Sequence, residues 1–142
     1  MNTDISIRID RVLDFYDVPQ LFTARDAFDT LYLCLLYEDS PECRYTAIRI
    51  SGRKLDCFLT GKTDLRGLFL HPETPDEYFE VSVHDNLFKI SGKVNAPIPE
   101  ACLPQEGYTA YAEEKESVVI HIPAADKGLL KELVRKFGWA CM

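Results

Sequence analysis

The order of short apolar runs along the chain limits the folds it can form more than any other feature of the sequence. Ile5, Ile7 and Ile9 alternate with polar residues, which is the period of a half-buried strand. Two further runs, 31–37 and 45–50, flank a turn rich in Asp, Ser and Pro, and this arrangement predicts a hairpin. The N-terminal part of the chain therefore predicts a succession of antiparallel strands.

Strand patterns return in the second half of the chain. The runs 78–83 and 87–90 alternate on either side of His84-Asp85-Asn86, which predicts a second hairpin turn. The segment 95–107 holds three prolines and one glycine and predicts an ordered surface loop. A short extended piece at 108–112 and a strand at 117–123 complete the strand candidates.

Two short helices are predicted between these groups of strands, at about 52–60 and 64–70. Ser51 is a helix-capping residue type, and Gly61 stands where a helix end favours a positive φ. Thr63 is expected to cap the second helix, which ends before Pro72. Each helix carries apolar residues at i, i+3 and i+4, on one face: Leu55, Phe58 and Leu59, then Leu65, Leu68 and Phe69.

The connection between these helices contains Gly61-Lys62-Thr63, the residue types that also close a nucleotide phosphate loop. Such a loop needs a second glycine five residues earlier, because several backbone N–H groups must surround the phosphates. Asp56 occupies that position, and the preceding segment is amphipathic and helical instead of a buried strand. The sequence therefore predicts a capped helix–helix connection with an exposed Lys62, and no phosphate loop.

The last element is a predicted C-terminal amphipathic helix at about 125–137, which Gly138 ends. Because the strands cluster before and after the mid-chain helices, the order disfavours a parallel sheet. The expected fold is α+β, in a single domain over residues 1–142. An antiparallel sheet of five to seven strands has one face covered by the two mid-chain helices and the C-terminal helix.

Composition and charge restrict the class of protein. Hydrophobic residues make up 46% of the chain and charged residues 27%, which is typical of globular proteins. A net charge of −7 disfavours binding to nucleic acid or anionic lipid. No apolar run approaches the about 20 residues that cross a bilayer. The N-terminal residues lack a signal-peptide pattern, so we expect a cytoplasmic protein without membrane contact.

The side chains that could carry chemistry are scattered along the sequence. The three histidines and five cysteines show no metal-ligand spacing, so no metal or other cofactor is expected. We expect the cysteines to be free thiols, and the sequence leaves open whether Cys43 or Cys102 is reactive. The weak catalytic candidates are Asp14, Tyr16 and Asp17, in the polar–aromatic stretch "LDFYDVPQLF", together with His121.

Several short motifs resemble those of a family of uncharacterised bacterial and phage-encoded domains, a domain of unknown function. The first is a Tyr-Asp-x-Pro-x-Leu-Phe segment. A Leu-Tyr-Leu strand and a Leu-Arg-x-x-Phe helix followed by Pro-Glu come next. Here these are Tyr16, Asp17, Pro19, Leu21 and Phe22; Leu31, Tyr32 and Leu33; and Leu65, Arg66, Phe69, Pro72 and Glu73. The resemblance covers about half of the chain and implies a small cytosolic domain with no catalytic residues to carry over.

The favoured function is a non-enzymatic binding or assembly module, and its protein partner is another protein or a second copy of the chain. The chain holds eight Phe, seven Tyr and one Trp, and Tyr and Trp are common anchors of interfaces. The C-terminal tail carries the expected interface residues, Phe137, Trp139 and Met142. This apolar tail is expected to dock either on the core of its own chain or on a second copy, which would make a homodimer. The alternative is a small enzyme with an Asp/Tyr-based site near residues 14–17.

Overall fold

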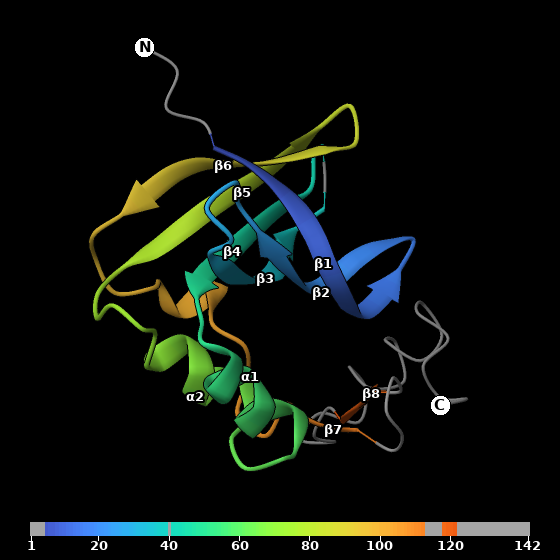
Figure 1. Cartoon of the computed structure of the whole chain (residues 1–142), viewed down its shortest axis with the longest axis vertical. Helices are drawn as coiled ribbons and strands as arrows, with labels where there is room; N and C mark the ends of the chain where they lie inside the picture. The colour runs from blue at the N-terminus through green and yellow to red at the C-terminus, as the bar shows by residue number, and fades with distance from the viewer. Residues whose placement is uncertain (1–4, 40, 113–117, 122–142) are drawn as a thin grey trace.

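The computed structural model describes residues 5–39, 41–112 and 118–121, and it places most of them in β-strands (Figure 1). The side chains of Tyr16 and of residues beyond Ala110 are not described. The strands are β1 (Ile5–Tyr16), β2 (Val18–Arg25), β3 (Leu31–Glu38), β4 (Arg44–Arg49), β5 (Tyr78–His84), β6 (Leu87–Val94), β7 (Thr109–Ala112) and β8 (Val118–His121). The helices are α1 (Gly52–Leu59), α2 (Leu65–Leu70) and a single 3-10 turn, Glu100–Cys102.

The first six strands form a closed antiparallel barrel in the order of the sequence, and β7 and β8 form a separate two-stranded sheet. The barrel closes where β1 pairs with β6 through Ile5–Ile90, Ser6–Lys89 and Ile7–Phe88. The expected α+β fold, a sheet with one face covered by helices, is therefore wrong. Periodicity identifies strands one by one, but it carries no signal for a pairing between the first strand and the sixth.

One barrel strand, β2, follows directly on Asp17 and was not expected as a strand of its own. Pro19 is the second residue of β2, close to the hairpin turn. A proline at the start of a strand interrupts the ladder of hydrogen bonds very little. The C-terminal helix expected at 125–137 lies outside the described residues.

Two apolar clusters hold the described part of the chain together, and neighbouring residues of β2, β3 and β4 belong to different clusters. The first cluster has members on all six barrel strands and fills the interior: Ile7, Phe22, Ala24, Tyr32, Cys34, Tyr45, Ala47, Phe79, Val81 and Ile90. The second lies between the outer face of the wall and the helices, and includes Leu21, Leu33, Ile48, Phe58, Leu65 and Phe69. Because these strands are buried on both faces, they read as continuous apolar runs.

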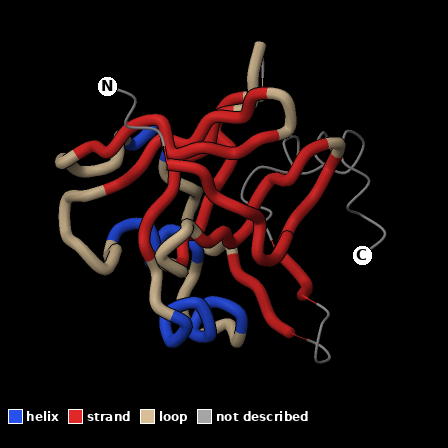
Figure 2. Tube along the Cα trace, turned by 45° about the horizontal axis from the view of Figure 1, so that its top comes forward, coloured by secondary structure: helices blue, strands red, loops and turns tan. Residues whose placement is uncertain are grey.

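The mid-chain helices form where the sequence predicted them and lie together beside the barrel (Figures 1 and 2). Ser51 caps α1, because its hydroxyl accepts a hydrogen bond from the Lys54 N–H at 3.2 Å. Asp64, not the expected Thr63, caps α2 by accepting from the Gly67 N–H at 2.8 Å. Gly61 has the positive φ of 78° that ends α1 without strain.

The long strand β1 is bent by irregularities in its pairing with β2. Its register shifts between Ile9 and Arg11, between Val12 and Asp14, and between Asp14 and Phe15. At the first two shifts the extra residue belongs to β1, which is the arrangement of a β-bulge, whereas at the third it is Gln20 of β2. The end of the β1–β2 hairpin stands away from the other barrel strands in both views (Figures 1 and 2).

Candidate functional site

The candidate residue Asp14 lies at the second bulge of β1, opposite Leu21, and contacts a residue far along the chain. The Tyr108 hydroxyl donates a hydrogen bond to Asp14 Oδ2 at 3.2 Å. Helix α2 fixes Tyr108 in turn, because the Leu65 N–H donates to the Tyr108 carbonyl at 2.8 Å. This contact ties β1 to the segment before β7, and no sequence pattern pointed to Tyr108.

The environment of this pair changes the acidity of both side chains. Burial raises the pKa of Asp14 to about 6, although hydrogen bonds from Tyr108 and the Phe15 N–H act to lower it. Burial raises the pKa of Tyr108 well above its usual value, and the negative charge of Asp14 adds to that effect. Asp14 can therefore gain or lose a proton near neutral pH, which is the property required of an acid–base group.

Among the described side chains, no other candidate residue contacts Asp14. Asp17 is exposed in the turn between β1 and β2, with a positive φ of 57°, a conformation that Asp tolerates better than most residues. Tyr16 is the last residue of β1, and His121 pairs with Thr109 in the β7–β8 sheet, but their side chains are not described. The predicted interface residues Phe137, Trp139 and Met142 lie outside the described residues.

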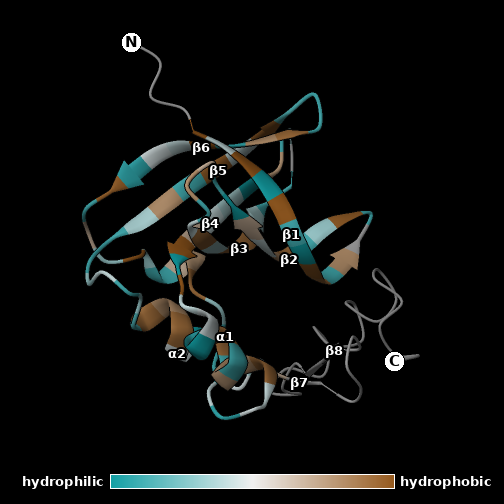
Figure 3. Cartoon of the chain, in the orientation of Figure 1, coloured by the Kyte–Doolittle hydropathy of each residue, from teal (hydrophilic) through white to brown (hydrophobic). Residues whose placement is uncertain are grey.

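A row of apolar side chains along β1 is the most unusual surface feature of the described residues. Ile9 faces Ala24 and Val12 faces Phe22 across the ladder, so both point to the same side as the barrel interior. They are nevertheless 36% and 42% exposed, and Phe15, which returns to this face after the second bulge, is 59% exposed. We call Ile9, Val12 and Phe15 the β1 row; apolar residues also appear at intervals along β1 in Figure 3.

The bulges explain both the spacing and the exposure of the β1 row. Each extra residue delays the alternation by one position, so the row continues from Ile9 to Val12 and Phe15 in steps of three. A strict alternation after Ile9 would have placed Arg11 and Leu13 on this face instead. The sequence held this signal in the spacing of its apolar residues, but the bulges were not recognised.

Among the described strands, β1 has a pairing partner on only one side over most of its length. On the side of β6, its pairing stops at Ile7, because β6 begins at Leu87 just after the β5–β6 turn. On the side of β2, pairing continues from Arg8 to Tyr16. Among the described strands, none pairs with the second side of residues 8–16, so this segment is a free sheet edge next to the β1 row.

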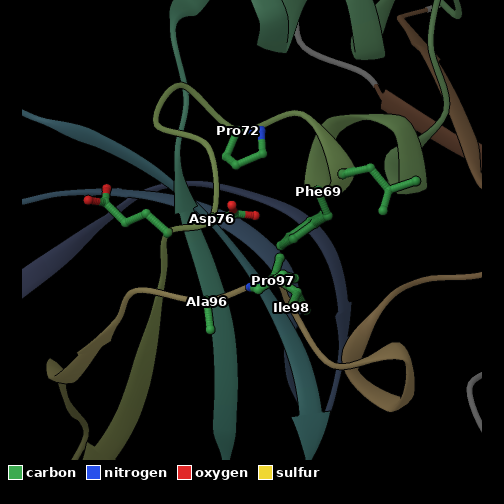
Figure 4. A pocket seen from close by; sticks show the side chains of 8 residues that line it. Phe69, Pro72, Asp76, Ala96, Pro97 and Ile98 are labelled. Carbon is green, nitrogen blue, oxygen red and sulfur yellow. The ribbon is translucent and has the colours of Figure 1, made fainter.

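Two pockets on the described surface have linings that are fully described. The first, of about 70 Å³, lies between α2 and the segments before β5 and after β6, where Phe69, Pro97 and Ile98 point toward one another (Figure 4). Its wall includes Glu77, a buried carboxylate bound by Arg49 at 2.6 Å and Lys93 at 3.2 Å. This pocket is well below the ~300 Å³ at which small-molecule sites begin.

The second pocket, of about 300 Å³, lies on strands β3 to β6 and has a mostly polar lining. Arg44, Glu42 and Glu80 provide its charges, and Tyr37, Ser82 and Ser91 provide hydroxyl groups. The Ser91 hydroxyl donates to the Glu80 carbonyl at 3.3 Å. The volume is at the lower limit for a small ligand, and the lining contains no nucleophile–base pair.

The remaining sequence candidates occupy structural positions. Lys62 is exposed, and its N–H donates to the Cys57 carbonyl at 2.8 Å as part of the turn that ends α1. Cys34 lies in the barrel interior, where burial raises the pKa of its thiol and makes it unreactive. Cys43 and Cys102 are half-buried free thiols. No cluster of metal-ligating side chains occurs among the described residues.

Comparison with known proteins gives one match. Residues 6–124 match the model of a family described as a family of unknown function, DUF6575. No curated protein and no solved structure matches the chain. Separately, no helix in the described ranges has the length and apolar composition needed to cross a membrane.

Proposed function

The chain belongs to the family of unknown function DUF6575, and we propose that it is a non-enzymatic binding module that recognises a protein through β1. The partner contacts the β1 row, Ile9, Val12 and Phe15, and extends the barrel sheet at the free edge of residues 8–16. The single observation that carries this proposal is that exposed apolar side chains coincide on one strand with backbone that no other described strand pairs with.

Each half of this observation has a known physical consequence. Exposed apolar side chains gathered in one place mark interaction sites, because their removal from water favours association. An unpaired strand edge offers N–H and C=O groups to a further strand, which is how many proteins bind extended peptides. The main chain then supplies affinity, and the alternate side chains of the β1 row supply specificity.

The experiment is site-specific photo-crosslinking in the native cell. We would place a photoreactive phenylalanine analogue at position 15 of the full chain and, as a control, at position 62, which is also exposed but carries Lys. Position 15 is expected to give discrete higher-mass adducts that position 62 does not give. Adducts at neither position, or the same adducts at both, would contradict the proposal.

The identity of the adduct distinguishes the two kinds of partner. A second copy of the chain gives an adduct of twice the chain mass and a sedimentation coefficient that rises with protein concentration. A different protein gives an adduct of another mass and leaves the purified chain monomeric. The free edge supports both, and the acidic net charge of −7 favours a partner other than the chain itself.

The proposal also covers the domain organisation, the origin and the binding properties expected from the sequence. The module is a single domain of cytoplasmic, bacterial or phage origin, which binds neither nucleic acid nor membranes and needs no cofactor. Phe137, Trp139 and Met142 remain predicted docking residues of the C-terminal tail, on their own chain or on a second copy. The match over residues 6–124 supports a domain that spans most of the chain.

The alternative, a small enzyme with a site near residues 14–17, has one observation in its favour. Asp14 has its pKa raised to about 6 beside Tyr108, which suits a general acid or base. The two proposals differ in their dependence on this carboxyl group. If the chain is a binding module, Asp14→Asn leaves the adducts at position 15 unchanged, whereas an enzyme loses turnover of any substrate that it is found to convert.

A further inference from the structure

The last described strand lies close to the strand that carries the proposed binding surface. Strand β8 ends at His121 and approaches β1 to Cα–Cα separations of 8 Å or less. The 21 residues that follow, 122–142, lie outside the described residues, so the sequence alone describes them. They follow directly on His121, and any three residues of fully extended chain span about 10 Å.

The sequence of this segment suits an apolar surface. A helix over 125–137 would gather its apolar residues on one face: Leu129, Leu130, Leu133, Val134 and Phe137. Thirteen helical residues measure about 20 Å. The six steps of strand from Ile9 to Phe15 also span about 20 Å. The apolar face of the segment thus matches the β1 row in length.

The charges of the two parts of the chain are complementary. Residues 1–121 hold 12 basic and 21 acidic side chains, a net charge of −9, whereas residues 122–142 hold four basic and two acidic ones, a net charge of +2. The acidic part includes Asp10, which is next to Ile9 of the β1 row, and Asp17, which lies at the hairpin turn. Opposite net charges favour contact between the segment and the rest of the chain.

We propose that residues 122–142 dock on the β1 row of their own chain and compete there with the protein partner. The competition rests on the proposed function, because it requires a protein partner. The intramolecular contact itself does not depend on the proposed function. Docking in the same chain needs no second molecule, so its effective concentration is high and independent of the protein concentration. The partner then binds only the fraction of molecules in which the segment has left β1.

The first test uses the purified full-length chain with the photoreactive phenylalanine analogue at position 15. Irradiation is expected to give a monomeric product in which position 15 is joined to a peptide from 122–142, with a yield that does not change on dilution. The analogue at position 62 is expected to give no such peptide. Cross-links only in a dimer band, or only to residues 5–121, would overturn the inference.

The second test changes the segment and leaves β1 intact. Leu133→Glu, on the predicted apolar face, is expected to lower the yield of the intramolecular cross-link at least fivefold. Glu132→Gln, its neighbour on the polar face, is the matched control and should leave the yield within twofold. Equal yields in both variants would show that the apolar face does not contact β1.

A third test, the affinity of the partner for the variant chain, distinguishes this inference from the proposed function. Once cross-linking in cells has identified it, its affinity for the Leu133→Glu chain is expected to rise at least threefold, because the competitor is weakened. A fall in affinity would mean that the segment contributes to the partner's site, and would overturn the competition. If the intramolecular cross-link forms but no partner adduct is ever found, the docking stands and the proposed function fails.

Discussion

β1 and β3 are strands of one barrel that each carry seven apolar residues, among 12 residues in β1 and 8 in β3, yet they lie in different surroundings. β3 pairs with β2 on one side and with β4 on the other, and Tyr32, Leu33 and Cys34 are buried. Among the described strands, β1 has partners on both sides only over Ile5–Ile7, and beyond that point Ile9, Val12 and Phe15 are partly exposed. The difference lies in where the neighbouring strands end, because both strands offer apolar side chains to the interior.

This comparison separates two uses of an apolar side chain. In β3 it fills one of two cores and contributes to the free energy of unfolding. In the free part of β1 it stays in contact with water, at little cost to the fold, and remains available to another surface. Substitutions that remove apolar volume should therefore affect stability strongly in β3 and binding strongly in β1.

The largest effect is expected from Leu33→Ala in β3. Leu33 is fully buried in the cluster between the barrel wall and the helices, so the substitution removes buried methyl groups and leaves a cavity. We expect the free energy of unfolding to fall by about 2–5 kcal/mol. Val12→Ala in β1 is the control, with an expected loss below about 1 kcal/mol. Equal losses in urea titrations of the two variants would break the comparison.

The next effect concerns the helical layer that covers the outer face of β3. Gly61→Val should lower the free energy of unfolding by about 1 kcal/mol or more, because a φ of 78° is costly for a β-branched residue. The neighbouring Lys62→Ala should leave the melting temperature almost unchanged, and ATP should not raise it. A rise with ATP that Lys62→Ala abolishes would restore the phosphate loop that the sequence argued against.

The third effect is on the dependence of stability on pH, at the point where β1 is fixed by Tyr108. The pKa of Asp14 in the folded chain is about 6, above its usual 3.8, so the folded state binds this proton more tightly. The resulting stabilisation is complete below about pH 4 and is lost as the pH rises through 6. Asp14→Asn should remove this loss, and its stability relative to the native chain should rise by on the order of 1 kcal/mol between pH 4 and pH 7, since Asp14 is half-exposed.

Tyr108→Phe sharpens this third prediction. The Tyr108 hydroxyl lowers the pKa of Asp14, so its removal should raise that pKa above the native value. Carboxyl titration followed by NMR measures both proteins. A downward shift would mean that the hydrogen bond does not favour the ionised carboxylate.

The smallest effect on stability is expected at the exposed end of β1. Phe15→Ser should change the free energy of unfolding by no more than about 0.5 kcal/mol, while it weakens binding of the partner. Phe28→Ser is the control, because Phe28 is 87% exposed at the β2–β3 turn and is not part of the β1 row. Similar losses of partner binding in both variants would place the binding surface elsewhere.

Local features of the fold could be predicted from the sequence, because local physics determines them. The caps at Ser51 and Gly61 and the burial of Leu65, Leu68 and Phe69 follow from spacing and residue type. The strands at 31–37 and 45–50 also form, as β3 and β4. The closure of the barrel could not be predicted, because the pairing of Ile7 with Phe88 depends on contacts between distant segments.

The candidate site shows the same limit. Asp14 was singled out by its polar–aromatic surroundings, but its partner Tyr108 was not, since 94 residues separate them. The β1 row could not be predicted from alternation, because two bulges interrupt the period that identifies strands. Bulges depend on how two strands twist against each other, and one strand's sequence does not determine that twist.

The short pairing between β1 and β6 has a consequence for folding during synthesis on the ribosome. It joins the ends of a chain segment of roughly 80 residues, so its closure carries the largest entropy cost of any ladder in the barrel. A ribosome that adds about 5–20 residues per second releases β1 several seconds before it releases β6. During that interval neither outer edge of the nascent β1–β2 hairpin has its later barrel partner. The hairpin is therefore most prone to aggregation, and most accessible to a chaperone, before β6 is synthesised.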